Sequence, residues 1–176
     1  MADGLQIPHT SDDASIVISV DAMGGDRGPA AVVAGLVDCA TALPHLRFLL
    51  HGDEAQLKPL LSRHPALAPR ITLRHAERVV SMEDKPSQVM RHGQGTSMWA
   101  TIDALRDGEA GAAVSCGNTG ALMAVSMLRL RKMPGVNRPA IASLFPTPTP
   151  GKMNVMLDMG ADVKAEPGDL LQFAFM

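Results

Sequence analysis

The chain has 176 residues, and its 16 Lys and Arg against 18 Asp and Glu give a formal net charge of −2. This balance and an aromatic content of 3% exclude the basic field and the base-stacking platforms of a nucleic-acid-binding protein. A hydrophobic fraction of 46% predicts a buried core. The two cysteines form no CxxC pair, and no apolar run reaches the ~20 residues of a membrane helix, so a cytoplasmic protein is predicted.

The first half of the chain alternates between predicted strands and helices after a flexible tail over residues 1–14. Short β-branched or apolar runs predict the strands, and proline or aspartate at a helix start predicts the helices. The predicted strands cover 16–20, 46–50 and 71–73, and the predicted helices run from Pro29 toward Pro44 and from Asp53 through Leu61. This alternation is typical of a parallel α/β sheet covered on both faces.

The second half begins with a polar, irregular segment over 76–97. Helices are predicted over Ser97–Leu105, after the turn at 115–120, and from Pro167 to the last residue; strands are predicted over 112–114, Pro139–Phe145 and Asn154–Asp158. A short proline-rich connection joins the last two strands, which leaves no room for a crossover helix. They are therefore expected to be antiparallel neighbours in a mixed sheet.

The segment from Ser115 to Gly120 breaks an apolar strand and opens an apolar helix. Gly117 and Gly120 permit positive φ and close backbone approach. Asn118 or Thr119 can cap the helix. Backbone N–H groups and the positive end of the helix dipole would then face an anion, either a phosphate or a developing oxyanion. An ordinary capped turn is the alternative that the spacing leaves open.

A second glycine turn follows the first predicted strand and contains Asp21, Gly24, Gly25 and Asp26. Ligands of parallel α/β sheets bind at the carboxyl ends of the strands, so this turn is a candidate second wall of the same site. It matches neither the G-x-G-x-x-G pattern of dinucleotide-binding proteins nor a P-loop. A tight turn with solvated acids is the alternative.

A third turn of this kind begins at Asp158, directly after an apolar strand. A charge at that position needs a partner, so Asp158 would orient a water or a substrate hydroxyl, or cap the next turn. We expect the three turns to meet at one edge of the sheet. The candidate cations are Lys85, Arg91 and Lys152, each of which could neutralise a phosphate or simply be solvated.

Metal binding and thiol chemistry are not expected. The six histidines show no ligand spacing, so no metal site is predicted. Cys116 lies at a predicted helix N-terminus, where a thiol can be activated, but no histidine is near it in sequence to act as a base. We therefore interpret Cys116 as a small buried residue.

Six sequence blocks follow one another in an order characteristic of one family. They are VDAMGGDRGP, HGDE, VSMEDKPSQVMR, VSCGNTGALMA, RPAIA and MLDMGADVKAEPGDLLQFAFM. With these blocks the chain resembles the acyl-carrier-protein-dependent phosphate acyltransferases of bacterial phospholipid synthesis, from about residue 16 to the last residue.

The resemblance implies a three-layer α/β/α sandwich with a mostly parallel mixed sheet, similar to isocitrate and isopropylmalate dehydrogenases, of which residues 15–176 would be the N-terminal part. It implies transfer of a long-chain acyl group from acyl carrier protein to inorganic phosphate, which gives acyl phosphate for phospholipid synthesis. It also implies a homodimer, peripheral association with the inner face of the membrane, and no metal or redox cofactor.

Phosphate is already nucleophilic at neutral pH, so this reaction mainly requires two anions held together and a stabilised oxyanion. The candidate catalytic residues are Asn118, Thr119 and Asp158. The candidate substrate-binding residues are Asp21, Gly24, Gly25, Asp26, Arg91, Ser97, Ser115, Gly117, Gly120 and Lys152. Two alternatives stay open: a phosphotransacetylase-like enzyme that uses acyl-coenzyme A, and a non-catalytic domain that binds the carrier protein.

Overall fold

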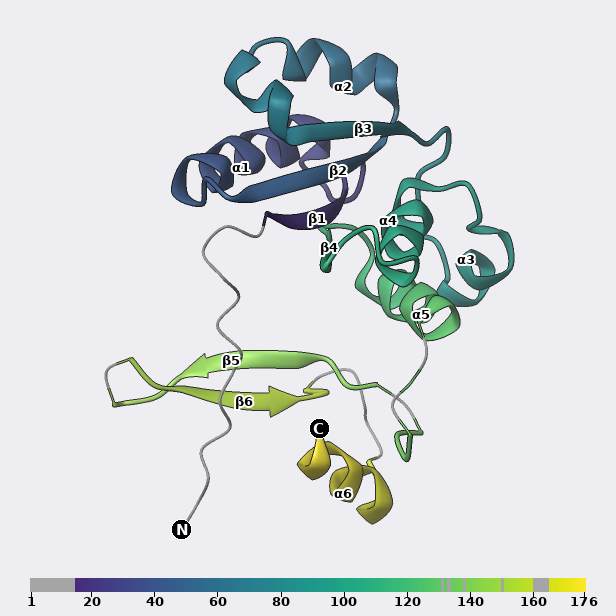
Figure 1. Ribbon diagram of the computed structural model, residues 1–176. Helices are drawn as coiled ribbons and strands as arrows, with labels where there is room; N and C mark the ends of the chain where they lie inside the picture. Colours follow the sequence, from purple (N-terminus) through teal and green to yellow (C-terminus); the bar gives the residue numbers. More distant parts are fainter. Residues whose placement is uncertain (1–14, 131, 133, 138, 150, 160–164) are drawn as a thin grey trace. The chain divides into compact units, whose positions relative to one another are not determined.

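The computed structural model describes residues 15–176 except 131, 133, 138, 150 and 160–164. The predicted tail over 1–14 lies outside the described residues. The chain divides into two compact units, Met1–Leu130 and Arg131–Met176 (Figure 1). The prediction of one domain over residues 15–176 stays a prediction.

A four-stranded parallel sheet with the order β3-β2-β1-β4 forms the centre of the first unit. The strands are β1 (Ile16–Asp21), β2 (Leu46–Gly52), β3 (Ile71–His75) and β4 (Ala112–Ser115). In the central strand, Asp21 is in register with His51 of β2 and with Ser115 of β4. The carboxyl ends of these three strands therefore lie level at one edge of the sheet.

Helices cover both faces of this sheet (Figure 1). The helices of the first unit are α1 (Gly28–Ala42), α2 (Glu54–Leu61), the 3-10 helix η1 (Pro65–Arg70), α3 (Pro86–His92), α4 (Ser97–Arg106) and α5 (Thr119–Arg129). On one face, Leu36 of α1 and Leu57 of α2 join Val20 in a buried core. On the other face, α4 packs against β1, β2 and β4, and α5 packs against α3 and α4.

The alternation of side chains along β1 decides what each face contains. Val20 points into the core beneath α1, whereas Val17 packs with Ala104 of α4 on the opposite face. Because successive strand residues alternate, Ser19 and Asp21 share the face of Val17. Polar residues of β1 are thereby placed beneath α4, at the carboxyl edge of the sheet.

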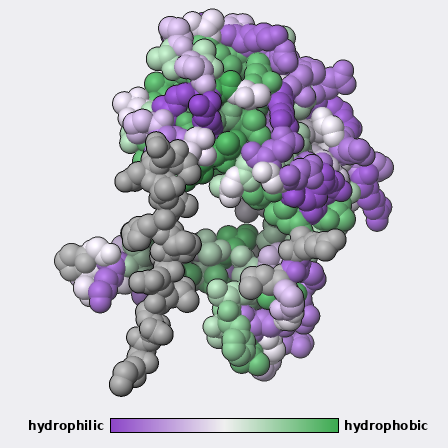
Figure 2. Space-filling view, in the orientation of Figure 1, coloured by the Kyte–Doolittle hydropathy of each residue, from purple (hydrophilic) through white to green (hydrophobic). Residues whose placement is uncertain are grey.

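The second unit contains a hairpin of β5 (Ala142–Pro146) and β6 (Met153–Leu157), followed by α6 (Pro167–Phe175). The predicted antiparallel pairing of the two strands is confirmed. The prediction of a mixed sheet is wrong for the described residues, because the hairpin is a sheet of its own and the four-stranded sheet is wholly parallel. Hydrophobic residues gather on α6 in Figure 2, where Leu170, Leu171 and Phe175 are exposed.

The predicted α/β class, with a mostly parallel sheet between helices, is confirmed. The strands and helices of the first unit lie where the sequence predicts them, with two additions, η1 and α3. None of the helices in the described part of the chain combines the length and the apolar character that crossing a membrane requires.

Candidate functional site

The turn after β1 and the turn after β4 are in direct contact. A Cβ atom added to Gly24 would lie 2.7 Å from the backbone N of Gly117 and 2.7 Å from Oδ2 of Asp21. Gly25 has a φ of +96°, and a Cβ atom there would lie 2.8 Å from the carbonyl oxygen of Cys116. The close approach of the two turns therefore requires glycine at both positions. For these two turns, the predicted convergence at the sheet edge is confirmed.

Asp21 connects the two turns through hydrogen bonds. Its side chain is 2% exposed, and its Oδ1 accepts a bond of 3.2 Å from the N–H of Met23 in the first turn. Its Oδ2 accepts a bond of 2.7 Å from the hydroxyl of Ser115. The Ser115 oxygen in turn accepts a bond of 3.1 Å from the N–H of Gly117. One buried carboxyl group thus fixes both backbones, and the Gly117 N–H is used within the protein.

Asn118 caps α5 and holds a neighbouring loop. Its Oδ1 accepts a bond of 3.0 Å from the N–H of Ala121, which confirms the predicted cap. Its Nδ2 donates to the carbonyl oxygens of Met82 at 2.9 Å and of Asp84 at 3.0 Å. The side-chain amide therefore joins the loop at 81–84 to the start of the helix.

The first turn of α5 retains unused donors. In the part of the chain that the structure describes, the N–H groups of Thr119 and Gly120 make no hydrogen bond. Thr119 is exposed, so its N–H is open to solvent at the positive end of the helix. These two groups are the part of the predicted anion site that the protein leaves available.

Gly120 also has a packing role. A Cβ atom there would lie 3.0 Å from Cγ of Pro86, the second residue after Asp84 and the first of α3. Helix α3 lies in the segment over 76–97 that is predicted to be irregular. A proline at the first helical position is the signal that could have found it.

A polar zone is buried beneath α4, next to the two turns. Four side-chain atoms there are buried without a hydrogen-bond partner among the described residues: Oγ of Ser19 and of Ser97, Nε2 of His51, and Oγ1 of Thr101. Ser97 and Thr101 lie one turn apart on α4, which contacts β1 and β2. Ser97 is thus buried in the protein interior at the start of α4, beside the strand that carries Asp21.

The ionisation of His51 is controlled by its burial. Burial lowers the pKa of His51 from 6.5 to about 4, and the nearby Arg74 guanidinium adds to this shift. The folded protein therefore holds His51 neutral at a pH at which the unfolded chain already binds a proton. A histidine whose pKa is lower in the folded state than in the unfolded state contributes its full stability above the unfolded-state pKa. This contribution is lost as the pH falls toward the folded-state pKa.

We expect the stability conferred by neutral His51 to be fully present above a pH of about 6.5 and to decrease toward pH 4, by up to about 3 kcal/mol. Urea unfolding of the wild type and of His51→Asn across this range measures the effect. The wild type should lose more free energy of unfolding than the variant on acidification. Equal losses would contradict a buried neutral imidazole.

The remaining predicted residues lie apart from this contact or in the second unit. Asp26 is exposed in the first turn, and Arg91 is exposed in the last turn of α3. Lys152 precedes β6. Asp158 follows β6 and is buried, and its backbone has a φ of 56°. Its N–H donates to the carbonyl oxygen of Ile141 at 2.8 Å. The participation of Lys152 and Asp158 in the site stays a prediction.

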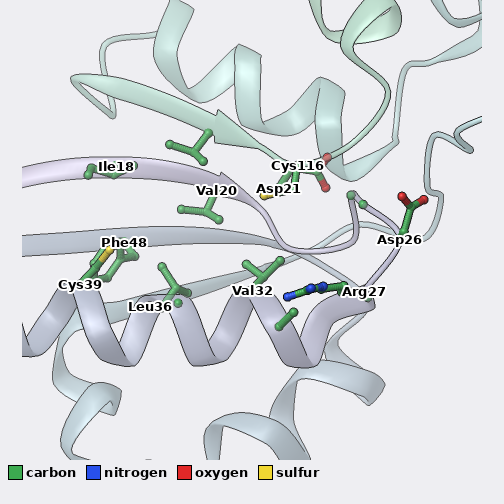
Figure 3. A pocket seen from close by; sticks show the side chains of 16 residues that line it. Ile18, Val20, Asp21, Asp26, Arg27, Val32, Leu36, Cys39, Phe48 and Cys116 are labelled. Carbon is green, nitrogen blue, oxygen red and sulfur yellow. The ribbon is translucent and has the colours of Figure 1, made fainter. Parts of the chain in front are cut away.

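An apolar groove of about 450 Å³ adjoins the two turns (Figure 3). Arg27 lines it beside Asp26 and is a cation outside the predicted set. Its place within the glycine turn is the signal that points to it. Cys116 also lines the groove, and the prediction that this residue is buried is wrong, because its side chain is exposed at the groove wall. Within the described residues, no cluster of His, Cys, Asp or Glu is arranged to hold a metal ion.

Comparisons with known proteins place this chain in a family. The profile of the family described as "Fatty acid synthesis protein" matches residues 16–176. A phosphate acyltransferase of Cereibacter sphaeroides is 64% identical over 169 residues, which cover 96% of this chain and 46% of that protein. A phosphate acyltransferase of Paracoccus denitrificans is 59% identical over 176 residues, which cover 99% of this chain and 48% of that protein.

The chain spans about half the length of these curated relatives. The family profile nevertheless covers both units and includes the β1 and β4 turns that touch. The chain therefore belongs to the fatty acid synthesis protein family whose curated members are named phosphate acyltransferases.

Proposed function

We propose that this chain transfers a long-chain acyl group from acyl carrier protein to inorganic phosphate, giving acyl phosphate for phospholipid synthesis. The observation that carries the proposal is the contact between Gly24 and Gly117, which brings two strand-end turns together in a member of this family. The names of these relatives support the acyl transfer to phosphate. The acyl-carrier-protein donor is supported by the resemblance of the six sequence blocks.

In the proposed mechanism, the N–H groups of Thr119 and Gly120 and the dipole of α5 hold the phosphate, and Arg27 neutralises part of its charge. A phosphate oxygen attacks the thioester carbonyl carbon and forms a C–O bond. The tetrahedral oxyanion collapses, the C–S bond breaks, and the thiolate leaves and takes up a proton from solvent. Asp21 and Ser115 position the two turns, and Asn118 positions the start of α5 against the loop at 81–84. Cys116 takes no covalent part.

The resemblance supports four further parts of this proposal. They are an isocitrate/isopropylmalate-dehydrogenase-like sandwich, a homodimer, a cytoplasmic location, and peripheral association with the membrane. Roles of Arg91, Lys152 and Asp158 in substrate binding or catalysis, and a reaction without a metal or redox cofactor, also rest on the sequence alone.

The proposal is tested with Thr119→Pro. Thr119 is the first residue of α5 and follows Asn118, whose ψ of 110° lies outside the α region, so proline fits there and removes one N–H without breaking the helix. We expect phosphate-dependent thiol release from long-chain acyl carrier protein to fall by about 100-fold, because a small misplacement of the bound phosphate can cost that much. Thr119→Ala keeps the N–H and is the matched control, and it should retain most of the rate.

Each contrary outcome identifies an alternative. Activity with acetyl-coenzyme A but not with acyl carrier protein would indicate a phosphotransacetylase-like enzyme. Saturable carrier binding without phosphate-dependent release by the folded chain would indicate a non-catalytic binding domain. Equal release by the proline and alanine variants would exclude the start of α5 as the anion site.

A further inference from the structure

The groove beside the two turns has an apolar body and a polar end. Ile18 and Val20 of β1 line its wall, with Val114 of β4 and Leu36 of α1. Figure 3 shows Asp26 and Arg27 at the end next to the turns and Cys39 at the opposite end, beyond Leu36. Its volume of about 450 Å³ lies within the range of roughly 300–1,000 Å³ that is usual for small-molecule sites.

This polarity matches a ligand with an alkyl chain and a polar, reactive head. A charged or sugar-like ligand would leave its polar groups unpaired along Ile18, Val20 and Val114. An alkyl chain would be removed from water by the same side chains. The head of such a ligand would lie at Gly24, Gly25 and Cys116, where the two turns meet.

We infer that this groove binds the alkyl chain of the acyl donor, with the carbonyl at the two turns and the chain extending along α1 toward Cys39. The inference rests on the proposed function and assigns a place to one part of its substrate. Gly35 has the central role: it lines the groove, and a Cβ atom added to it would meet no atom within 4 Å. Gly35 therefore leaves open the space that a long chain needs.

Position 35 lies seven residues beyond Gly28, so it is about 10 Å farther along the helix than the turn. A larger side chain there would obstruct the distal part of the groove and leave the part near the turns open. Each methylene kept out of the groove costs about fourfold in affinity. The residue at position 35 is thus a determinant of acyl chain length.

The first test is the chain-length preference of Gly35→Leu. We expect release from palmitoyl carrier protein to fall by at least about tenfold while release from butyryl carrier protein stays near the wild-type rate. Ala34→Leu is the matched control, because it adds the same side chain to an exposed neighbouring position that does not line the groove. An unchanged palmitoyl preference in a folded Gly35→Leu protein would overturn the inference.

A second test measures binding without turnover. The chain has two cysteines, Cys39 and Cys116, and both are exposed in the groove. In a Cys116→Ser protein, palmitate should slow the alkylation of Cys39 by N-ethylmaleimide, butyrate should not, and Gly35→Leu should abolish the protection. Protection by palmitate without acyl transfer would support the groove and contradict the proposed function.

The opposite pair of results also separates the groove inference from the proposed function. Phosphate-dependent acyl transfer without palmitate protection would support the proposed function and overturn the groove. Protection of Cys39 that rises with protein concentration and needs no palmitate would show that a second copy of the chain covers the groove, which also overturns the inference.

Discussion

Replacing Gly24 with alanine is expected to reduce phosphate-dependent acyl release by about 100-fold, because a small displacement of a positioning element can cost that much. The added Cβ would lie 2.7 Å from the backbone N of Gly117 and 3.0 Å from its Cα, so a backbone and not a flexible side chain must move. The same Cβ would press on Oδ2 of Asp21, the atom that accepts the Ser115 hydroxyl. The substitution therefore separates the two turns and breaks their shared hydrogen bond.

The measurement is thiol release together with urea unfolding, in which we expect Gly24→Ala to lose about 1–3 kcal/mol, the usual cost of overpacking. Gly111→Ala is the matched control, since its Cβ would meet only the Val17 carbonyl oxygen, at an ordinary 3.9 Å. That control should release thiol at close to the wild-type rate. A folded Gly24→Ala protein with wild-type activity would show that the two turns need not touch.

Replacing Asn118 with alanine should lower the free energy of unfolding by about 2–3 kcal/mol. Loss of the cap on Ala121 accounts for about 1 kcal/mol, and loss of the bonds to Met82 and Asp84 accounts for about 1 kcal/mol each at most. Hydrogen exchange should show faster exchange in the loop at 81–84 and in the first turn of α5.

Asn118→Asp separates the two functions of this side chain. The carboxylate can still accept from the Ala121 N–H and favours the positive end of α5, but it cannot donate to the loop carbonyl oxygens. We expect the aspartate variant to keep slow exchange at the start of α5 and to show fast exchange at 81–84. Unchanged exchange of the loop in both variants would contradict the assigned contact.

Local signals were sufficient for the elements that carry the two turns. The β-branched run of β1, the proline at the start of α1 and the Asn118 cap each act within a few residues, and each is where the sequence predicts it. Helix α3 lacks such a local signal apart from Pro86. It is short, and its position depends on packing against α5.

The predictions that failed concern relations between distant residues. Cys116 is exposed because it lines the groove formed by β1, α1 and β4, and no local sequence pattern reports that groove. The separate sheet of β5 and β6 likewise depends on which edges pair. The bond between Asp21 and Ser115 follows only from the strand order that places β4 beside β1.

That strand order has a consequence for folding. The hydrogen bond between Asp21 and Ser115 joins residues 94 positions apart, whereas β1 pairs with β2 across a much shorter loop. Closing a longer loop costs more chain entropy, so we expect the β1–β2–β3 layer to form before β4 joins it. During synthesis, the turn after β1 would wait for residues 112–117 to leave the ribosome. The two turns would then meet in the last step of sheet assembly.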